Sequence, residues 1–244
     1  MKKIFFIFLS CFLIFGCHEN NGDVKKESLE KEVTQEKRIK FSDISSDKYK
    51  DKGKEIFEEV LKKDNITPEI FNNMIDEIVQ KVSVETDEFN KEIKIIPNDE
   101  EITDKIKIEI YRYNYTDDDY INDYYVRGNI TFTCINDDYF SFDKIIILTD
   151  RNRYEITGNV FAQNQERING KSFHTIKYEI DADKLGMIYD MAFSDTIKIR
   201  FTKNDNNLDF EISDGEKSRI KTMADLFYTS YELKLFFEEM NKKL

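Results

Sequence analysis

Histidine, proline, glycine and cysteine are all scarce in this chain of 244 residues, and each shortage excludes something. Two histidines are too few for any metal site that uses several of them, and they leave His174 as the candidate histidine base. Two prolines and eight glycines argue against a Pro- or Gly-rich surface. The chain has no glycine-rich phosphate-binding loop and no Gly-x-Ser-x-Gly motif, so we predict no cofactor and no serine hydrolase.

The long apolar run of the sequence lies at the N-terminus. The first three residues are basic, residues 4–16 are apolar apart from Ser10, and the composition turns polar from His18 onward. A charged start followed by a short apolar run is typical of an export signal. These 13 residues are fewer than the about 20 that a membrane-spanning helix needs. No alanine precedes Ala162, which also disfavours an A-x-A cleavage site.

The end of the run, Ile14-Phe15-Gly16-Cys17, resembles the lipobox of bacterial lipoproteins. The resemblance covers residues 1–17 only. It implies that Cys17 receives a diacylglycerol and becomes the mature N-terminus after residues 1–16 are removed. Gly16 fits the pattern, whereas Ile14 replaces the commoner leucine and Phe15 is bulkier than usual. Two alternatives are lipidation at Cys11, after a shorter apolar run, and an ordinary secretory signal with an incidental cysteine.

Lipidation at Cys17 would make the membrane the first partner of the protein. Two or three acyl chains on one cysteine anchor a protein stably, in the cell membrane or the outer membrane, facing the periplasm or the exterior. Removal of 16 residues, two of them lysines, changes the net charge from −12 to −14. Such a charge disfavours nucleic acid and anionic headgroups as partners. Cys134 would be the one remaining thiol, so an intramolecular disulfide is excluded.

The mature chain divides into a tether and one α+β domain. Residues 17–47 are predicted to be flexible, because eight acidic and six basic side chains alternate there with few apolar ones. A transient charged helix is the alternative. Residues 48–244 are predicted to form the domain, with a helical part at 48–90, a β-rich part at 91–212 and a C-terminal helix at 213–244.

Three helical patterns flank and interrupt the β-rich part. Apolar residues at helical spacing in 48–84, with Thr67 as N-cap and Pro68 after it, predict an N-terminal pair of antiparallel helices. A short helix is predicted over Asp183–Phe193. Ser213-Asp214-Gly215-Glu216 has the spacing of a capping box and predicts the start of the C-terminal helix.

From Ile93 to Ile212 the apolar period is two, which predicts an antiparallel meander of about six to eight strands. Apolar residues occupy even positions up to Ile110, and tyrosines occupy odd positions from Tyr111, so we predict a β-bulge between the two. Cys134 is predicted to be a core thiol. His174 is predicted to be a structural histidine, because it shares the face of an apolar strand.

The candidate binding residues are aromatic. Six tyrosines gather in and after one predicted strand, and outward-facing tyrosines suit contact with protein or sugar; they are Tyr111, Tyr113, Tyr115, Tyr120, Tyr124 and Tyr125. If the bulge turns them inward they are core instead. No metal site is predicted, because the acidic run that starts at Asp117 has Asn122 where a calcium loop needs glycine.

These patterns favour a lipoprotein that binds an envelope or host protein, or a glycan, without catalysis. Two alternatives remain open at this stage. One is an envelope-anchored hydrolase that uses paired carboxylates, whose separation in space the sequence does not show. The other is a structural lipoprotein that positions further envelope components.

Overall fold

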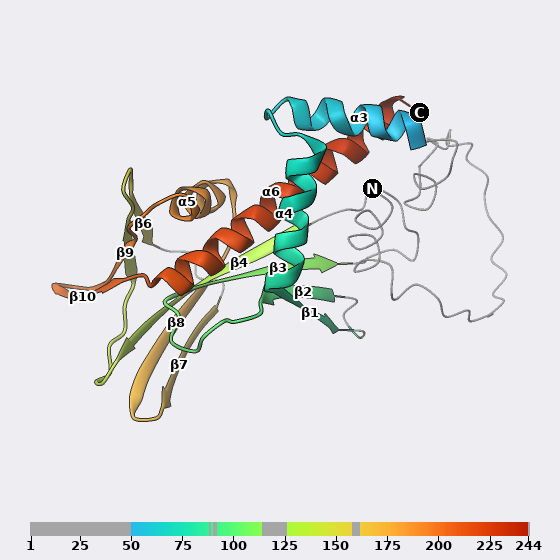
Figure 1. Cartoon of the computed structure of the whole chain (residues 1–244). Helices are drawn as coiled ribbons and strands as arrows, with labels where there is room; N and C mark the ends of the chain where they lie inside the picture. The colour runs from blue at the N-terminus through green and yellow to red at the C-terminus, as the bar shows by residue number, and fades with distance from the viewer. Residues whose placement is uncertain (1–49, 88, 90–91, 114–125, 158–161, 244) are drawn as a thin grey trace, which may run out of the picture.

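The computed structural model of the protein describes residues 50–87, 89, 92–113, 126–157 and 162–243 (Figure 1). The predicted leader, Cys17 and the predicted tether lie outside these residues. The described part is mixed α and β, with four helices and ten strands. In chain order the elements are α3 (Lys50–Lys62), α4 (Pro68–Lys81), β1 (Val82–Asp87), β2 (Glu92–Pro97), β3 (Ile106–Tyr113), β4 (Val126–Asn136), β5 (Lys144–Leu148), β6 (Arg153–Thr157), β7 (Ala162–Ile168), β8 (Lys171–Glu179), α5 (Ala182–Ala192), β9 (Lys198–Lys203), β10 (Asn206–Glu211) and α6 (Asp214–Lys243).

The strands form two antiparallel sheets instead of the single meander that we predicted. The six-stranded sheet has the order β1-β2-β3-β4-β8-β7, and the four-stranded sheet has the order β10-β9-β5-β6. After β4 the chain enters the second sheet for the β5–β6 hairpin and then returns for β7 and β8. A turn-length gap shows where a strand ends, but it does not show whether the next strand pairs with it. The prediction of one meander was therefore wrong.

The predicted bulge in β3 was also wrong. The strand pairs with β4 in unbroken register, from Ile106 opposite Phe132 to Arg112 opposite Val126. Because side chains alternate between the faces of a strand, Ile106 and Ile110 are buried in the core while Tyr111 lies on the opposite face. Along β3 the larger side chains therefore pass from one face of the sheet to the other, without any break in the pairing.

Gly128 in β4 permits a close approach of α6 to this sheet. A Cβ atom there would lie 2.4 Å from Cζ of Phe227 and 2.9 Å from Cδ1 of Ile180. We expect Gly128→Ala to lower the free energy of unfolding by about 1–3 kcal/mol, because the ring must move within a packed core. Gly186→Ala in α5 is the control, since its Cβ would meet nothing within 4 Å and alanine favours a helix by about 0.5–1 kcal/mol. Urea unfolding of both variants checks this, and equal stabilities would contradict it.

The predicted N-cap of α4 is confirmed and α5 begins one residue before the predicted start, at Ala182, but α3 and α4 do not form an N-terminal pair. Thr67 caps α4, its Oγ1 accepting a hydrogen bond from the backbone N–H of Ile70 at 3.2 Å. Both helices pack against α6, which crosses the molecule beside them (Figure 1). The rings of Phe57 in α3 and Phe236 in α6 lie 5.3 Å apart. The apolar stripes of α3 and α4 thus pack against α6 as well as against each other.

The main core lies between the two sheets and the helices α5 and α6. Isoleucine and phenylalanine side chains from both sheets fill it, together with methionines of α5 and α6. A smaller apolar cluster of Leu61, Phe71 and Ile75 joins α3 and α4, and Leu233 of α6 packs against it. None of the four described helices is both long and apolar enough to cross a membrane.

Candidate functional site

The structure describes two of the six predicted binding tyrosines. Tyr111 and Tyr113 belong to β3, whereas Tyr115, Tyr120, Tyr124, Tyr125 and the acidic run at Asp117 fall within 114–125, outside the described residues. The Tyr111 side chain is half-buried on the sheet face opposite to the core isoleucines. It belongs to a charged cluster that the sequence did not reveal.

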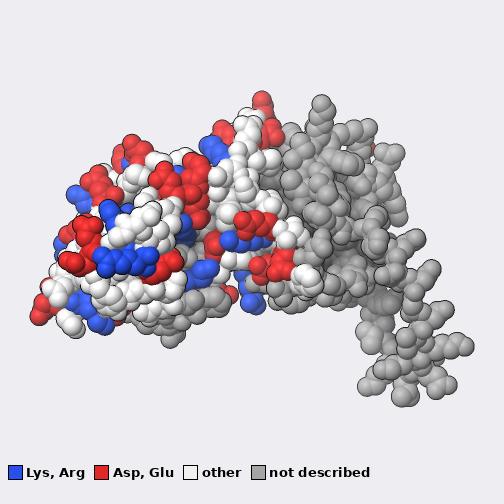
Figure 2. All heavy atoms as spheres, turned by 90° about the horizontal axis from the view of Figure 1, so that it is seen from below, with Lys and Arg blue, Asp and Glu red and all other residues white. Residues whose placement is uncertain are grey.

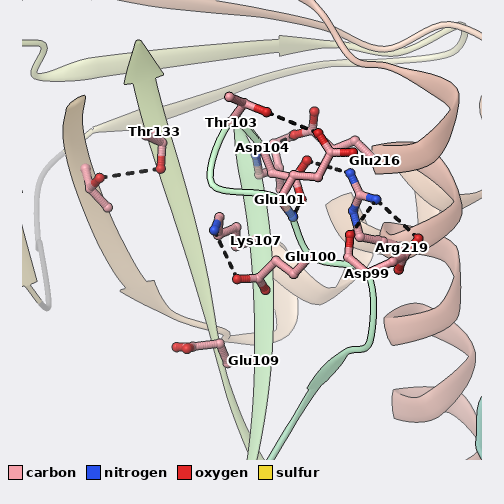
Figure 3. Close-up of polar contacts among 12 residues, drawn as sticks. Asp99, Glu100, Glu101, Thr103, Asp104, Lys107, Glu109, Thr133, Glu216 and Arg219 are labelled. Carbon is pink, nitrogen blue, oxygen red and sulfur yellow. Dashed lines mark hydrogen bonds and ion pairs between the residues drawn. The ribbon is translucent and has the colours of Figure 1, made fainter. Parts of the chain in front are cut away.

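Glu109 is the centre of this cluster, which we call the Glu109 cluster (Lys94, Glu109, Tyr111 and Lys177). Its Oε1 lies 2.9 Å from Nζ of Lys94 in β2, and its Oε2 lies 2.6 Å from Nζ of Lys177 in β8. The hydroxyl of Tyr111 donates a hydrogen bond to the same Oε2 at 2.7 Å. Lys177 reaches this carboxylate across β4, which separates β8 from β3. Glu109 points away from α6 (Figure 3).

Electrostatics fix the protonation states within the Glu109 cluster. Burial opposes the charged form of Glu109, but hydrogen bonds from Lys177, Lys94 and Tyr111 outweigh it and lower its pKa to about 2. Burial and the neighbouring carboxylate raise the pKa of Tyr111. At neutral pH Glu109 is therefore ionised and the phenol of Tyr111 is neutral. Such a group can bind a polar partner, but Glu109 is no general acid.

Charged groups of both signs also mark the wider surface. Figure 2 shows acidic and basic side chains interspersed with uncharged surface on the face seen from below. The chain as a whole has a net charge of −12. A partner that docks on this face meets local charge pairs instead of one uniform field.

A second cluster ties the β2–β3 connection to the start of α6. Nη2 of Arg219 lies 2.6 Å from Oδ1 of Asp104, with side chains only 8% and 4% exposed. The Nη1 of Arg219 also donates to the backbone carbonyl of Asp99 at 3.0 Å. Figure 3 shows Arg219 and Glu216 of α6 beside these residues. The adjacent cavity is about 10 Å³, room for one water at most, so we assign this cluster a structural role.

Glu216 corrects the predicted capping box. Oγ of Ser213 accepts a hydrogen bond from the backbone N–H of Glu216 at 3.2 Å, which is one half of the box. The Glu216 side chain instead accepts the backbone N–H of Ile106 at 2.6 Å, in a buried position. Burial, with the carboxylate of Asp104 adding to it, raises the pKa of Glu216 to about 7.

A third carboxyl group is perturbed where the α3–α4 turn meets α6. Glu232 of α6 is buried, and burial together with the carboxylate of Asp64 raises its pKa to about 7. Asp64 lies in the turn and accepts a hydrogen bond from the hydroxyl of Tyr228 at 3.0 Å. Like Glu216, Glu232 is almost fully buried.

The predicted structural histidine and core thiol are confirmed. The ring of His174 is fully buried, and its Nδ1 accepts the backbone N–H of Phe142 at 3.0 Å. Its Nε2 lies 2.7 Å from the side-chain amide of Gln163, and burial lowers its pKa. Cys134 is buried opposite His174, which raises the pKa of its thiol to about 12. Both groups are unsuited to catalysis.

One larger cleft, of about 480 Å³, separates the strand β6 from the helix α5. Two of the carboxylates that line it are held ionised. Lys144 and Arg153 lower the pKa of Glu155, and Lys184 lowers the pKa of Asp181. Among the residues that the structure describes, no three His, Cys, Asp or Glu side chains converge to hold a metal ion. Compared with protein families, curated proteins and solved structures, the chain matches none of them.

Proposed function

We propose that the protein is a lipid-anchored bacterial envelope protein whose domain binds a partner without catalysing a reaction. The lipobox-like sequence that ends at Cys17 supports the anchor. The charged segment 17–47 supports a tether that lets the domain stand away from the membrane.

The placement of the perturbed carboxyl groups carries the proposal of binding over catalysis. A carboxyl group that acts as a general acid needs a raised pKa and access to the substrate. Glu216 and Glu232 have raised pKa values but are buried. The Glu109 side chain is 15% exposed and that of Glu155 is 39% exposed, and both have lowered pKa values because cations hold them ionised. Ionised, paired groups on a surface suit recognition of a polar partner.

The Glu109 cluster is the face that we assign to the partner. It combines a tyrosine with two lysines and a carboxylate held in fixed geometry by three strands. Tyrosine supplies a large contact area at a small cost in conformational entropy, and prearranged charges favour one partner over others. Envelope proteins, host proteins and glycans all meet this description.

Site-specific photo-crosslinking in cells tests the proposal. With benzoylphenylalanine in place of Tyr111, we expect a discrete adduct in the membrane fraction. The same replacement of Tyr231, an exposed tyrosine on α6, is the control and should give none. Cys17→Ala should abolish fatty-acid labelling, release the protein from membranes and remove the adduct. Continued labelling of that variant would contradict the anchor, and equal adducts at both tyrosines would contradict the binding face.

A further inference from the structure

The cleft between β6 and α5 runs beside a sheet edge. β6 is the last strand of the four-stranded sheet and pairs only with β5 among the described strands. Residues of β6 and of the first turns of α5 line the cleft. An unpaired strand edge offers a row of backbone donors and acceptors to any extended segment that can reach it.

The β5–β6 hairpin fixes which backbone groups of β6 face outward. Its closing pair is hydrogen-bonded, with the N–H of Thr149 donating to the carbonyl of Asn152 at 3.0 Å. Hydrogen-bonded and non-hydrogen-bonded pairs alternate along an antiparallel ladder. Arg153, Glu155 and Thr157 therefore occupy non-hydrogen-bonded pairs with β5. Their N–H and C=O groups point away from β5, toward the cleft side of the strand.

The cleft beside β6 has room for the side chains of an incoming strand, which a free edge alone does not provide. Its floor is apolar, formed by the buried side chains of Ile156, Tyr178 and Met187. Its rim carries the acids Glu155, Asp181 and Asp183. Lys144 and Arg153 pair with Glu155, and Lys184 pairs with Asp181, so Asp183 is the rim acid that remains for a basic side chain of a partner. An entering strand would place every second side chain toward the floor, and a basic group on it would complement Asp183.

We propose that the β6 edge binds an extended segment of a partner protein as an added strand, with alternate apolar side chains in the cleft and a basic side chain beside Asp183. This inference rests on the proposed binding function and specifies the chemistry of the partner. A second copy of the chain fits less well. The inward-facing side chains of β6 are already committed to their own core, because Ile156 is buried and the hydroxyl of Tyr154 donates to Asp190 at 3.0 Å.

Two labelled nonapeptides test the proposal against the full mature protein in detergent. One has valine at alternate positions with lysine and threonine between, and the other has the same sequence with N-methyl groups on the backbone amides that would donate to β6. We expect saturable binding of the first in fluorescence anisotropy, and at least tenfold weaker binding of the second. Equal binding of both peptides, or binding of neither, would overturn the proposal.

A proline in the edge gives the matching test from the side of the protein. Glu155→Pro removes the outward N–H and leaves the bonds to β5 in place, because Glu155 is in a non-hydrogen-bonded pair. Glu155→Ala loses the same side chain but keeps the N–H. We expect the proline variant to bind the first peptide at least tenfold more weakly than the alanine variant. If the proline variant does not fold, as judged by circular dichroism, the comparison of the two peptides decides alone.

Two further outcomes separate this inference from the proposed function. If the proline and alanine variants bind peptide equally while the adduct at Tyr111 persists in cells, strand addition is wrong and the binding function stands. If light scattering shows a dimer that Glu155→Pro converts to a monomer, the edge belongs to a second copy, which also overturns the proposal of a partner segment.

Discussion

Arg219→Met is expected to lower the free energy of unfolding by about 3–5 kcal/mol, because it leaves a buried carboxylate without its cation. The guanidinium of Arg219 is the ion-pair partner of Asp104 at 2.6 Å, and both side chains are nearly inaccessible to water. It also satisfies the backbone carbonyl of Asp99. Without it, the β2–β3 connection loses a tie to α6 that spans more than a hundred residues of sequence.

Lys221→Met is the matched control for this prediction. Lys221 lies two residues further along α6 and pairs with Asp225 at the same distance of 2.6 Å, but its side chain is 49% exposed. Pairs of this kind contribute about 0–1 kcal/mol, so guanidinium chloride unfolding should separate the two variants clearly. A double variant, Asp104→Leu with Arg219→Met, should recover most of the loss. A loss no larger than that of Lys221→Met would contradict the role assigned to the buried pair.

The contacts around Arg219 and Glu216 show which features could be predicted from the sequence and which could not. Local signals were reliable: Thr67 caps α4 as predicted, and Ser213 accepts the N–H of Glu216 at the start of α6. The Glu216 side chain departs from its local pattern because the N–H of Ile106, 110 residues away in sequence, needs a buried acceptor. No spacing rule contains that partner. The strand order also depends on long-range pairing, since β4 pairs with β8 although β5, β6 and β7 lie between them in the chain.

The candidate site shows the same division between local and long-range information. The sequence predicted a bulge that left the face of Tyr111 open, and the unbroken pairing of β3 with β4 places Tyr111 and Glu109 on the face opposite to the isoleucines. Their partners Lys94 and Lys177 come from β2 and β8, and only the assembled sheet brings them within 2.9 and 2.6 Å of one carboxylate. A sequence with 49 acidic and 37 basic residues offers too many such pairs to choose from. The Glu109 cluster was therefore beyond prediction, and a binding role for Tyr111 stays a prediction.

The carboxyl group of Glu232 should make the protein less stable as pH rises from about 4.5 to about 7. Burial and the nearby carboxylate of Asp64 raise the pKa of Glu232 to about 7 in the folded state, from the ordinary glutamate value of 4.5. The folded state therefore holds this proton more tightly than the unfolded state does. Below pH 4.5 both states are protonated and Glu232 contributes nothing; between pH 4.5 and 7 the free energy of unfolding falls, and above pH 7 the full cost remains.

Glu232→Gln is expected to raise the free energy of unfolding by about 1–3 kcal/mol at pH 8 and to change it little at pH 4.5. The amide is neutral at every pH and can still donate a hydrogen bond to Asp64, as the protonated acid does. Lys63 in the turn and the hydrogen bond from Tyr228 to Asp64 are unchanged, so the substitution removes one charge. Urea unfolding at half-unit steps of pH gives the measurement, with Glu238→Gln on the exposed side of α6 as the control.

Glu216 titrates in the same pH range, so the Glu232→Gln variant should keep part of the dependence of stability on pH. The double variant, Glu216→Gln with Glu232→Gln, should lose that remaining part. An unchanged pH profile in the double variant would show that neither carboxyl group is buried in its charged form.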